Sequence, residues 1–225
     1  MNNYDIYKNK EYKLLSGLAN SCFVFVCMFL LLFTGLMFYC NNFLTLYPVS
    51  QISMMPYINP NGIDEDYVYV NSNTNDITYG DVVICEKGPD LVIKRVIAMP
   101  GDNLMIKLTD DGYYSFFIQY SAQGEWVKLE EDYVRDKTVY ETSYNIFYTK
   151  GDKTFEIDEY GNQYLPITEN EIFLAGDNRL FSKDCIEYGA LDTMGLVGEV
   201  VYLIHGQNFK IFQVFTQFLG FIEWK

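Results

Sequence analysis

The chain has 225 residues, enough for one medium-sized domain with additional segments. Its net charge of -14 argues against nucleic-acid binding, because few basic side chains are available to neutralise phosphates. The five cysteines show no C-x-x-C spacing and there is a single histidine, so the sequence predicts no structural zinc site, and we expect neither a metal nor another cofactor.

The N-terminal segment is a short basic tail followed by a long uncharged stretch. The first 13 residues carry three lysines and two acidic side chains, and no charged side chain occurs from Leu14 to Ile63. Within this stretch, Leu15 to Tyr39 has about the length of a helix that crosses a bilayer. Because lysines precede it and no basic residue follows it closely, we expect a cytoplasmic tail over 1–13, a transmembrane anchor over 14–40 and an extracytoplasmic domain over 41–225.

A cleaved leader is the alternative interpretation of the same segment. A signal peptide would have a shorter apolar core with small residues at the cleavage site, whereas the exit here reads Phe38-Tyr39-Cys40-Asn41-Asn42. A lipoprotein cleavage site would need a small residue in place of Tyr39. The sequence therefore predicts an uncleaved anchor that crosses the cell membrane once.

Beyond the anchor, short runs of β-branched and aromatic residues are separated by Gly, Asn, Asp and Pro clusters. No long helical period appears between residues 64 and 205, so we predict a mainly β domain. Residues 109–168 are acidic and rich in tyrosine, and we expect them to form an added β-ribbon insertion. The predicted strands are Tyr67 to Val70, Asp81 to Cys85, Leu91 to Met99, Leu104 to Leu108, Tyr114 to Tyr120, Thr138 to Tyr148, Glu171 to Ala175 and Leu196 to Ile204.

The C-terminal tail over 209–225 has a different pattern. Phe212, Phe215, Leu219 and Ile222 recur at helical spacing, but the uncharged run is too short to cross a bilayer. Two interpretations stay open: an amphipathic helix on the membrane surface, and a helix or strand packed against the β core.

The cysteines divide into two groups. Cys22, Cys27 and Cys40 lie in or beside the apolar segment, where we expect them to act as apolar filler. Cys85 and Cys185 lie in the β domain. A disulfide between them is compatible with an oxidising compartment, and the sequence leaves that question open.

Ser53 follows the anchor closely, within Ser50-Gln51-Ile52-Ser53-Met54-Met55-Pro56. Met55 precedes a proline, which disfavours helical backbone and keeps this segment open. A serine hydroxyl is a weak nucleophile at neutral pH and needs a base. His205, the single histidine, lies far along the chain from any Ser-Asp motif, and we expect it to be structural.

Lys94 is the candidate base. Strand alternation places it on one face with Val92, Val96 and Ala98, where loss of hydration should lower the pKa of the ammonium. A lysine of that kind can accept a proton from a serine hydroxyl, whereas the Arg95 guanidinium stays protonated. The alternative is a lysine on an edge strand that reaches solvent.

Four motifs occur in a fixed order beyond the anchor. They are S-M-M-P at 53–56, G-D-V-V at 80–83, K-R-V-I-A-M-P-G-D at 94–102 and G-D-N-R-x-x-S-x-D at 176–184. As a set, they resemble the bacterial type I signal peptidases, and the resemblance extends from the anchor to about Val201. It implies a mostly antiparallel β fold built around a coiled, barrel-like catalytic sheet.

The resemblance also implies roles for individual residues. Ser53 would be the nucleophile, Lys94 the general base and Ser182 the hydroxyl that hydrogen-bonds the lysine and orients it. Arg95 would be structural, with Asp177 as its ion-pair partner. The implied supporting set is Arg95, Asp177, Asn178, Arg179 and Asp184. The implied substrates are secretory preproteins with small residues at the cleavage site, which reach the enzyme in the plane of the lipid bilayer.

The chain departs from the family pattern near both ends of the site. Gln51 stands where Ser or Gly is frequent, so the oxyanion would be bound by the Ser53 backbone N–H, with the Gln51 amide as candidate second donor. Ile186 stands where an arginine is typical, so Asp184 must pair elsewhere or lie near water.

These departures, with the enlarged acidic segment, motivate an alternative function: a weak or inactive relative that binds apolar segments or assists assembly at the cell surface. Such a protein has no need for a lysine on an apolar strand face. A third interpretation, an intracellular self-cleaving repressor, conflicts with the anchor.

Overall fold

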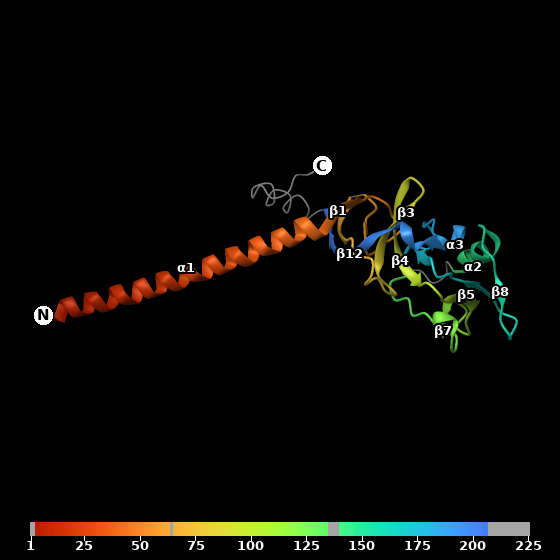
Figure 1. The fold of residues 1–225 in the computed structure, drawn as a ribbon, viewed down its shortest axis with the longest axis horizontal. Helices are drawn as coiled ribbons and strands as arrows, with labels where there is room; N and C mark the ends of the chain where they lie inside the picture. Colours follow the sequence, from red (N-terminus) through yellow and green to blue (C-terminus); the bar gives the residue numbers. More distant parts are fainter. Residues whose placement is uncertain (1–2, 64, 135–139, 207–225) are drawn as a thin grey trace.

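The computed structural model describes residues 3–63, 65–134 and 140–206. Its first element is α1, Asn3–Phe43, which projects as a single rod away from the β domain (Figure 1). The stretch Leu15–Tyr39 has a mean hydropathy of 2.5 and is not buried inside the structure. At about 1.5 Å per residue, these 25 residues exceed the ~30 Å of a bilayer core. The predicted apolar N-terminal helix is confirmed.

The larger sheet has seven strands, and every pairing in it is antiparallel. In spatial order the strands are β1 (Leu44–Val49), β2 (Asp66–Asn71), β12 (Leu196–Ile204), β3 (Val82–Lys87), β4 (Asp90–Ala98), β10 (Glu171–Ala175) and β11 (Leu191–Asp192). Register shifts interrupt three of the pairings, and such irregularities increase local twist. Because β4 lies between β3 and β10, Lys94 is on an interior strand, not an edge strand.

The smaller sheet has five antiparallel strands. In spatial order they are β7 (Val127–Lys128), β6 (Tyr114–Gln119), β5 (Asn103–Leu108), β9 (Gln163–Pro166) and β8 (Glu156–Ile157). Besides the longer helix α2, the described part of the domain contains three short helical elements: η1 (Tyr120–Ala122), α3 (Cys185–Tyr188) and η3 (Thr193–Gly195). The mainly antiparallel β fold predicted from the sequence is confirmed.

The strand predicted over Thr138 to Tyr148 is wrong, because α2 occupies Tyr140–Thr149. Ser143 and Phe147, four residues apart, are both buried, as expected for one face of a helix. The aromatic residues favoured a strand by composition, but their burial follows the helical period. Phe147 packs edge-on against Phe173 of β10, so α2 covers the core where the two sheets meet.

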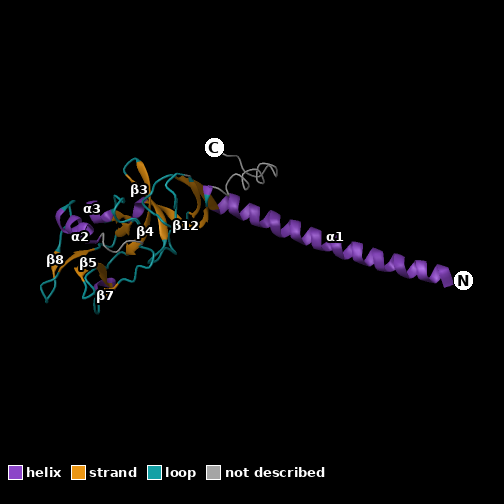
Figure 2. Ribbon diagram, turned by 180° about the vertical axis from the view of Figure 1, so that it is seen from behind, coloured by secondary structure: helices purple, strands orange, loops and turns teal. Residues whose placement is uncertain are grey.

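Different elements lie at the two ends of the β domain. Strands β1 and β12 lie at the end nearest α1, whereas α2, α3 and β8 lie at the remote end, and both ribbon views agree on this (Figures 1 and 2). The main hydrophobic core draws residues from both sheets and from α2. A second core cluster contains Met54 and Ile58, which fixes the segment that carries Ser53 against the larger sheet. The predicted C-terminal tail lies outside the described residues.

Candidate active site

Ser53 lies in a closed loop between β1 and β2. Asn59 closes this loop, because its Nδ2 donates to the Ser50 carbonyl at 3.0 Å. Asn59 itself has a φ of 54°, and its backbone N–H donates to the Asp66 carboxylate at 2.6 Å. The Met54 side chain is fully buried beside Ser53, which is 5% exposed. The local fold therefore holds the serine in a fixed and largely dry position.

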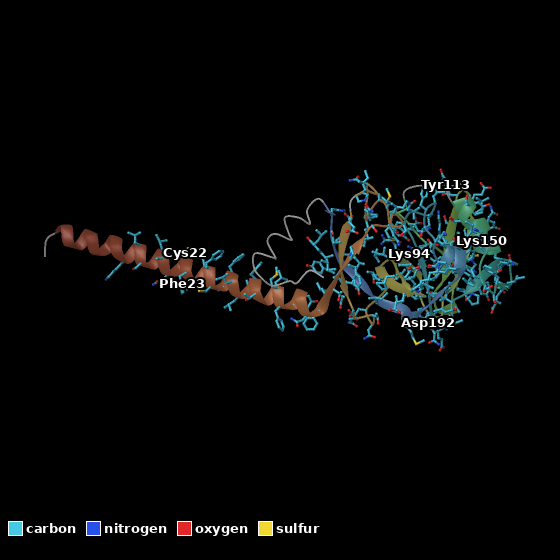
Figure 3. All side chains as sticks on the ribbon, turned by 90° about the horizontal axis from the view of Figure 1, so that it is seen from above. Cys22, Phe23, Lys94, Tyr113, Lys150 and Asp192 are labelled. Carbon is cyan, nitrogen blue, oxygen red and sulfur yellow. The ribbon has the colours of Figure 1, made fainter. Side chains whose placement is uncertain are left out.

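Lys94 lies in the interior of the larger sheet and is 2% exposed (Figure 3). Its Nζ is 2.9 Å from Ser53 Oγ and 2.8 Å from the Ile93 carbonyl oxygen. Burial lowers the pKa of Lys94, although the carboxylates of Asp184 and Asp177 act in the opposite direction. The structure thus brings together a serine hydroxyl and a lysine amine separated by 41 residues in the chain.

The 176–179 turn, which follows β10, holds the backbone of the Ser53 loop. The Asn178 backbone N–H donates to the Ser53 carbonyl, and Asn178 Nδ2 donates to the Ile52 carbonyl, both at 3.0 Å. Gly176 permits this approach, because a Cβ there would lie 2.5 Å from the Ser53 carbonyl oxygen and still closer to Ser182 Oγ. Any larger residue at 176 would push the turn and the loop apart.

Arg95, next to Lys94, forms the ion pair expected with Asp177. Its Nε and Nη2 donate to the two carboxylate oxygens at 2.8 and 2.6 Å, and its Nη1 donates to the Gly80 carbonyl at 2.6 Å. A bidentate pair of this kind fixes orientation as well as distance. Burial raises the pKa of Asp177, against the effect of the guanidinium. Arg95 therefore ties β4 to the 176–179 turn.

Asp184 finds partners without an arginine at position 186. Its carboxylate accepts from the backbone N–H groups of Gly176 at 2.8 Å and Ile186 at 3.0 Å, so it caps α3. Burial raises the pKa of this carboxyl. Lys153 approaches the same helix from the opposite end and donates to the Ile186 carbonyl at 2.7 Å. Backbone amides thus replace the ion pair that the sequence lacks.

The hydrogen bond predicted between Ser182 and Lys94 is not formed. Ser182 Oγ is buried beside Gly176 and has no hydrogen-bond partner of good geometry in the described part of the chain. It lies close enough to Asp184 to oppose, in part, the burial that raises the pKa of that carboxyl. Lys94 Nζ instead contacts Ser53 and the Ile93 carbonyl. The sequence pattern placed Ser182 beside the turn that supports Ser53 but did not determine its hydrogen bonds.

The remaining predicted residues lie at the edge of the site or outside it. Gln51 is exposed, and the backbone N–H of Ser53 donates to no atom of the described residues. His205 Nδ1 lies 3.0 Å from the Asp66 carboxylate at the end of β12, away from the Ser53–Lys94 pair.

Cys85 and Cys185 are both buried and both free. Within residues 3–63, 65–134 and 140–206, no group of three or more His, Cys, Asp or Glu side chains could hold a metal ion.

Glu131 is a buried site residue that sequence reasoning missed. Its carboxylate pairs with Arg179 at 2.5 Å, and Arg179 Nε donates to the Gly176 carbonyl at 2.9 Å. Glu130 and Asp132, its neighbours in the chain, are both exposed. No local pattern distinguishes the middle one of three consecutive acidic residues, so only the tertiary fold reveals it.

A groove of about 830 Å³ lies over the smaller sheet, remote from this constellation. Phe117, Trp126 and Tyr160 are among its lining residues, and Lys128 and Asp111 pair across part of it at 3.7 Å. Neither Ser53 nor Lys94 lines this groove, so it is separate from the candidate active site.

The family model described as "Signal peptidase, peptidase S26" matches residues 19–204. The signal peptidases IB of Staphylococcus aureus strains Mu50 and N315 are each 29% identical to the chain over 177 residues, which cover 71% of this chain and 82% of theirs. A crystal structure of a signal peptidase I from Enterococcus faecalis V583 covers 56% of this chain and 97% of that chain, with 20% identity and a TM-score of 0.35.

Proposed function

The chain belongs to the signal peptidases of the peptidase S26 family and is a signal peptidase I hydrolase, and on this premise we propose that it cleaves secretory preproteins by acyl-enzyme chemistry with Ser53 as nucleophile and Lys94 as general base. The observation that carries this proposal is the 2.9 Å separation of Lys94 Nζ and Ser53 Oγ in a site where both residues are buried. That distance lies within the range needed for direct proton transfer.

The proposed reaction has two stages. Ser53 Oγ attacks the scissile carbonyl carbon while its proton passes to the uncharged amine of Lys94. The ammonium then gives that proton to the departing amine, which becomes the N-terminus of the mature protein, and an ester remains on Ser53. Water attacks the ester and gives a proton to the same lysine, which returns it to Ser53 Oγ as the signal peptide leaves with a free carboxylate.

The oxyanion that develops at the scissile carbonyl needs donors that are already in place. The Ser53 backbone N–H supports this role, since it makes no bond to the described residues. The exposed Gln51 amide is the candidate second donor. Asn178 Nδ2 binds the Ile52 carbonyl, which belongs to the same peptide unit as the Ser53 N–H, and this bond keeps the N–H in a constant direction.

Membrane anchoring and orientation belong to the same proposal. The 25-residue apolar span of α1 supports a single crossing, with the lysine-rich tail in the cytoplasm and the β domain outside. Enzyme and preprotein would then share one membrane plane and search for each other in two dimensions. Protease accessibility of the β domain in intact cells tests this topology, and protection of the whole domain would contradict it.

The chemistry is tested with the full chain in membranes and a labelled preprotein. Ser53→Ala and Lys94→Ala should each reduce cleavage by roughly 10³-fold or more, because each removes one half of the reacting pair. Ser72→Ala and Lys107→Ala, at exposed positions outside the site, serve as matched controls and should cleave at the parent rate. Either site variant cleaving at the parent rate would refute the dyad, and saturable preprotein binding without cleavage by the parent would favour the binding function instead.

A further inference from the structure

The 176–179 turn holds the backbone of the Ser53 loop by hydrogen bonds. Two hydrogen bonds from Asn178 hold the carbonyls of Ser53 and Ile52. Any displacement of the turn is therefore passed directly to the peptide that carries the nucleophile. What fixes the turn also fixes the distance between Ser53 Oγ and Lys94 Nζ.

Two guanidinium groups bind the 176–179 turn. Arg95 binds the Asp177 carboxylate, and Arg179 folds back so that its Nε donates to the Gly176 carbonyl at 2.9 Å. The Arg179 side chain has no exposed surface, and the Glu131 side chain that pairs with it is 7% exposed. A buried guanidinium needs a carboxylate in good geometry, so the position of Arg179 depends on Glu131.

Tyr133 contacts both the Glu131–Arg179 pair and Arg95. Its hydroxyl donates to Glu131 Oε1 at 2.9 Å, while its ring lies 4.2 Å from the guanidinium carbon of Arg95. Residues 131–133 therefore contact both cations that hold the turn, and they do so from the acidic segment 109–168, not from any of the four sequence motifs.

We propose that Glu131 is a positioning residue for the nucleophile, acting through Arg179 and the 176–179 turn on the carbonyl of Ser53. This inference deepens the proposed function and rests on it. The Glu131 carboxylate binds the Arg179 guanidinium and the Tyr133 hydroxyl. Its role is to hold a guanidinium whose other bond fixes the Gly176 carbonyl, next to the residue that binds the Ser53 peptide.

The proposal gives a specific part to a segment whose composition suggests only a solvated surface. Residues 109–168 contain twelve acidic and five basic side chains, a net charge of -7, which is half the charge of the whole chain. Glu130 and Asp132 are exposed, whereas Glu131 between them is buried against Arg179. The segment therefore contributes one carboxylate to the active-site support and presents the adjacent ones to solvent.

The first test compares Glu131→Gln with Glu130→Gln in the full chain, in detergent micelles with a peptide substrate. A loosened turn should reduce kcat by roughly 10–100-fold in Glu131→Gln, because a misplacement of about 1 Å can cost that much, while KM stays within about twofold. Glu130→Gln should match the parent in both constants. If kcat of Glu131→Gln stays within about twofold of Glu130→Gln, the inference is wrong.

A double-mutant cycle tests whether Glu131 acts through Arg179. Arg179→Met should lower kcat by a similar factor, and adding Glu131→Gln to it should reduce kcat by less than about twofold further. Independent multiplication of the two effects would show that Glu131 acts by another route and would overturn the inference.

Thermal unfolding of each variant checks that it is folded. If Glu131→Gln does not fold, Tyr133→Phe decides the matter, because it removes only the hydroxyl that bonds Glu131 and keeps the ring on Arg95. It should lower kcat by about two- to fivefold without changing KM, and an unchanged kcat would count against the inference. Ser53→Ala separates the two proposals: if it retains activity, the proposed chemistry fails, whereas an inactive Ser53→Ala beside a fully active Glu131→Gln refutes only the role of Glu131.

Discussion

Two lysines of the β domain lie in apolar surroundings, and their amines meet different partners. Lys94 Nζ contacts the Ser53 hydroxyl and one carbonyl, whereas Lys153 Nζ donates to two carbonyls of α3, those of Ile186 at 2.7 Å and Glu187 at 3.3 Å. Burial lowers the pKa of both amines, that of Lys153 to about 8.

The difference between the two sites supports Lys94 as the proposed base more strongly than the pKa does. Carbonyl oxygens accept hydrogen bonds and have no proton to give, so the surroundings of Lys153 only support an ammonium. The surroundings of Lys94 contain a hydroxyl within reach, on a loop that is held in place by Asn59 and Asn178. A lowered pKa is compatible with a lysine that accepts a proton, and the neighbouring hydroxyl supports Lys94 in that proposed role.

Replacing each lysine by arginine should separate the two sites most strongly. A guanidinium keeps the positive charge but does not lose its proton, so Lys94→Arg should lower kcat by roughly 10²–10⁴-fold. Lys153→Arg retains the donors that α3 requires and should stay within about threefold of the parent. Rates of preprotein cleavage by the purified full chain measure both variants, and equal losses would mean that the amine of Lys94 has no special role.

Gly176→Ala should disturb the contact between Lys94 Nζ and Ser53 Oγ while leaving Lys94 buried. The added Cβ would lie 2.5 Å from the Ser53 carbonyl oxygen, so the turn or the loop must move. We expect kcat to fall by about 10²-fold and stability to fall by about 1–3 kcal/mol. Gly35→Ala, where no atom lies within 4 Å of the new Cβ, is the matched control and should alter neither quantity. Parent-like kinetics for Gly176→Ala would show that the site tolerates this shift.

The pH dependence of cleavage should reveal the charges around Lys94. Since only the uncharged amine can accept a proton, activity should rise with pH through the lowered pKa of Lys94, below its usual value of 10.5. Asp184 raises that pKa, so Asp184→Asn, which keeps an oxygen to cap α3, should move the rising limb to lower pH. A limb that moves to higher pH, or does not move, would contradict this account of the lysine.

The sequence predicted the larger sheet better than the smaller one. The bounds predicted for β10 and β12 agree with the structure, because each is a mainly apolar run bounded by turn residues, Asn170 and Gly176 for β10 and Gly195 and Gly206 for β12. Burial at α2 follows a helical period that the aromatic composition concealed. The short strands β7, β8 and β11 have two residues each and leave no pattern to detect.

The candidate site could also be predicted only in part from the sequence. Strand alternation on β4 placed Lys94 on an apolar face but left open a lysine that reaches solvent, and the family resemblance paired it with Ser53. The contacts of Glu131 and Asn59 could not be predicted, because each joins parts of the chain through side-chain geometry that no local spacing encodes. The absent bond from Ser182 has the same cause: a motif gives the residue and its neighbourhood, and packing decides its rotamer.

The smallest expected effect is on stability, and it should again distinguish the two lysines. Between the lowered pKa of folded Lys94 and its unfolded value of 10.5, the unfolded chain binds a proton that the folded chain does not, so stability rises with pH in that window. At pH 7 the buried amine is therefore a cost to folding, and Lys94→Met should raise the free energy of unfolding by about 1–2 kcal/mol, a gain that disappears above pH 10.5. Lys153→Met loses two bonds to α3 and should gain less or be destabilised. Chemical denaturation at pH 7 and pH 10.5 measures the difference, and a Lys94→Met that is equally destabilised at both would mean that the amine of Lys94 is held charged in the folded protein.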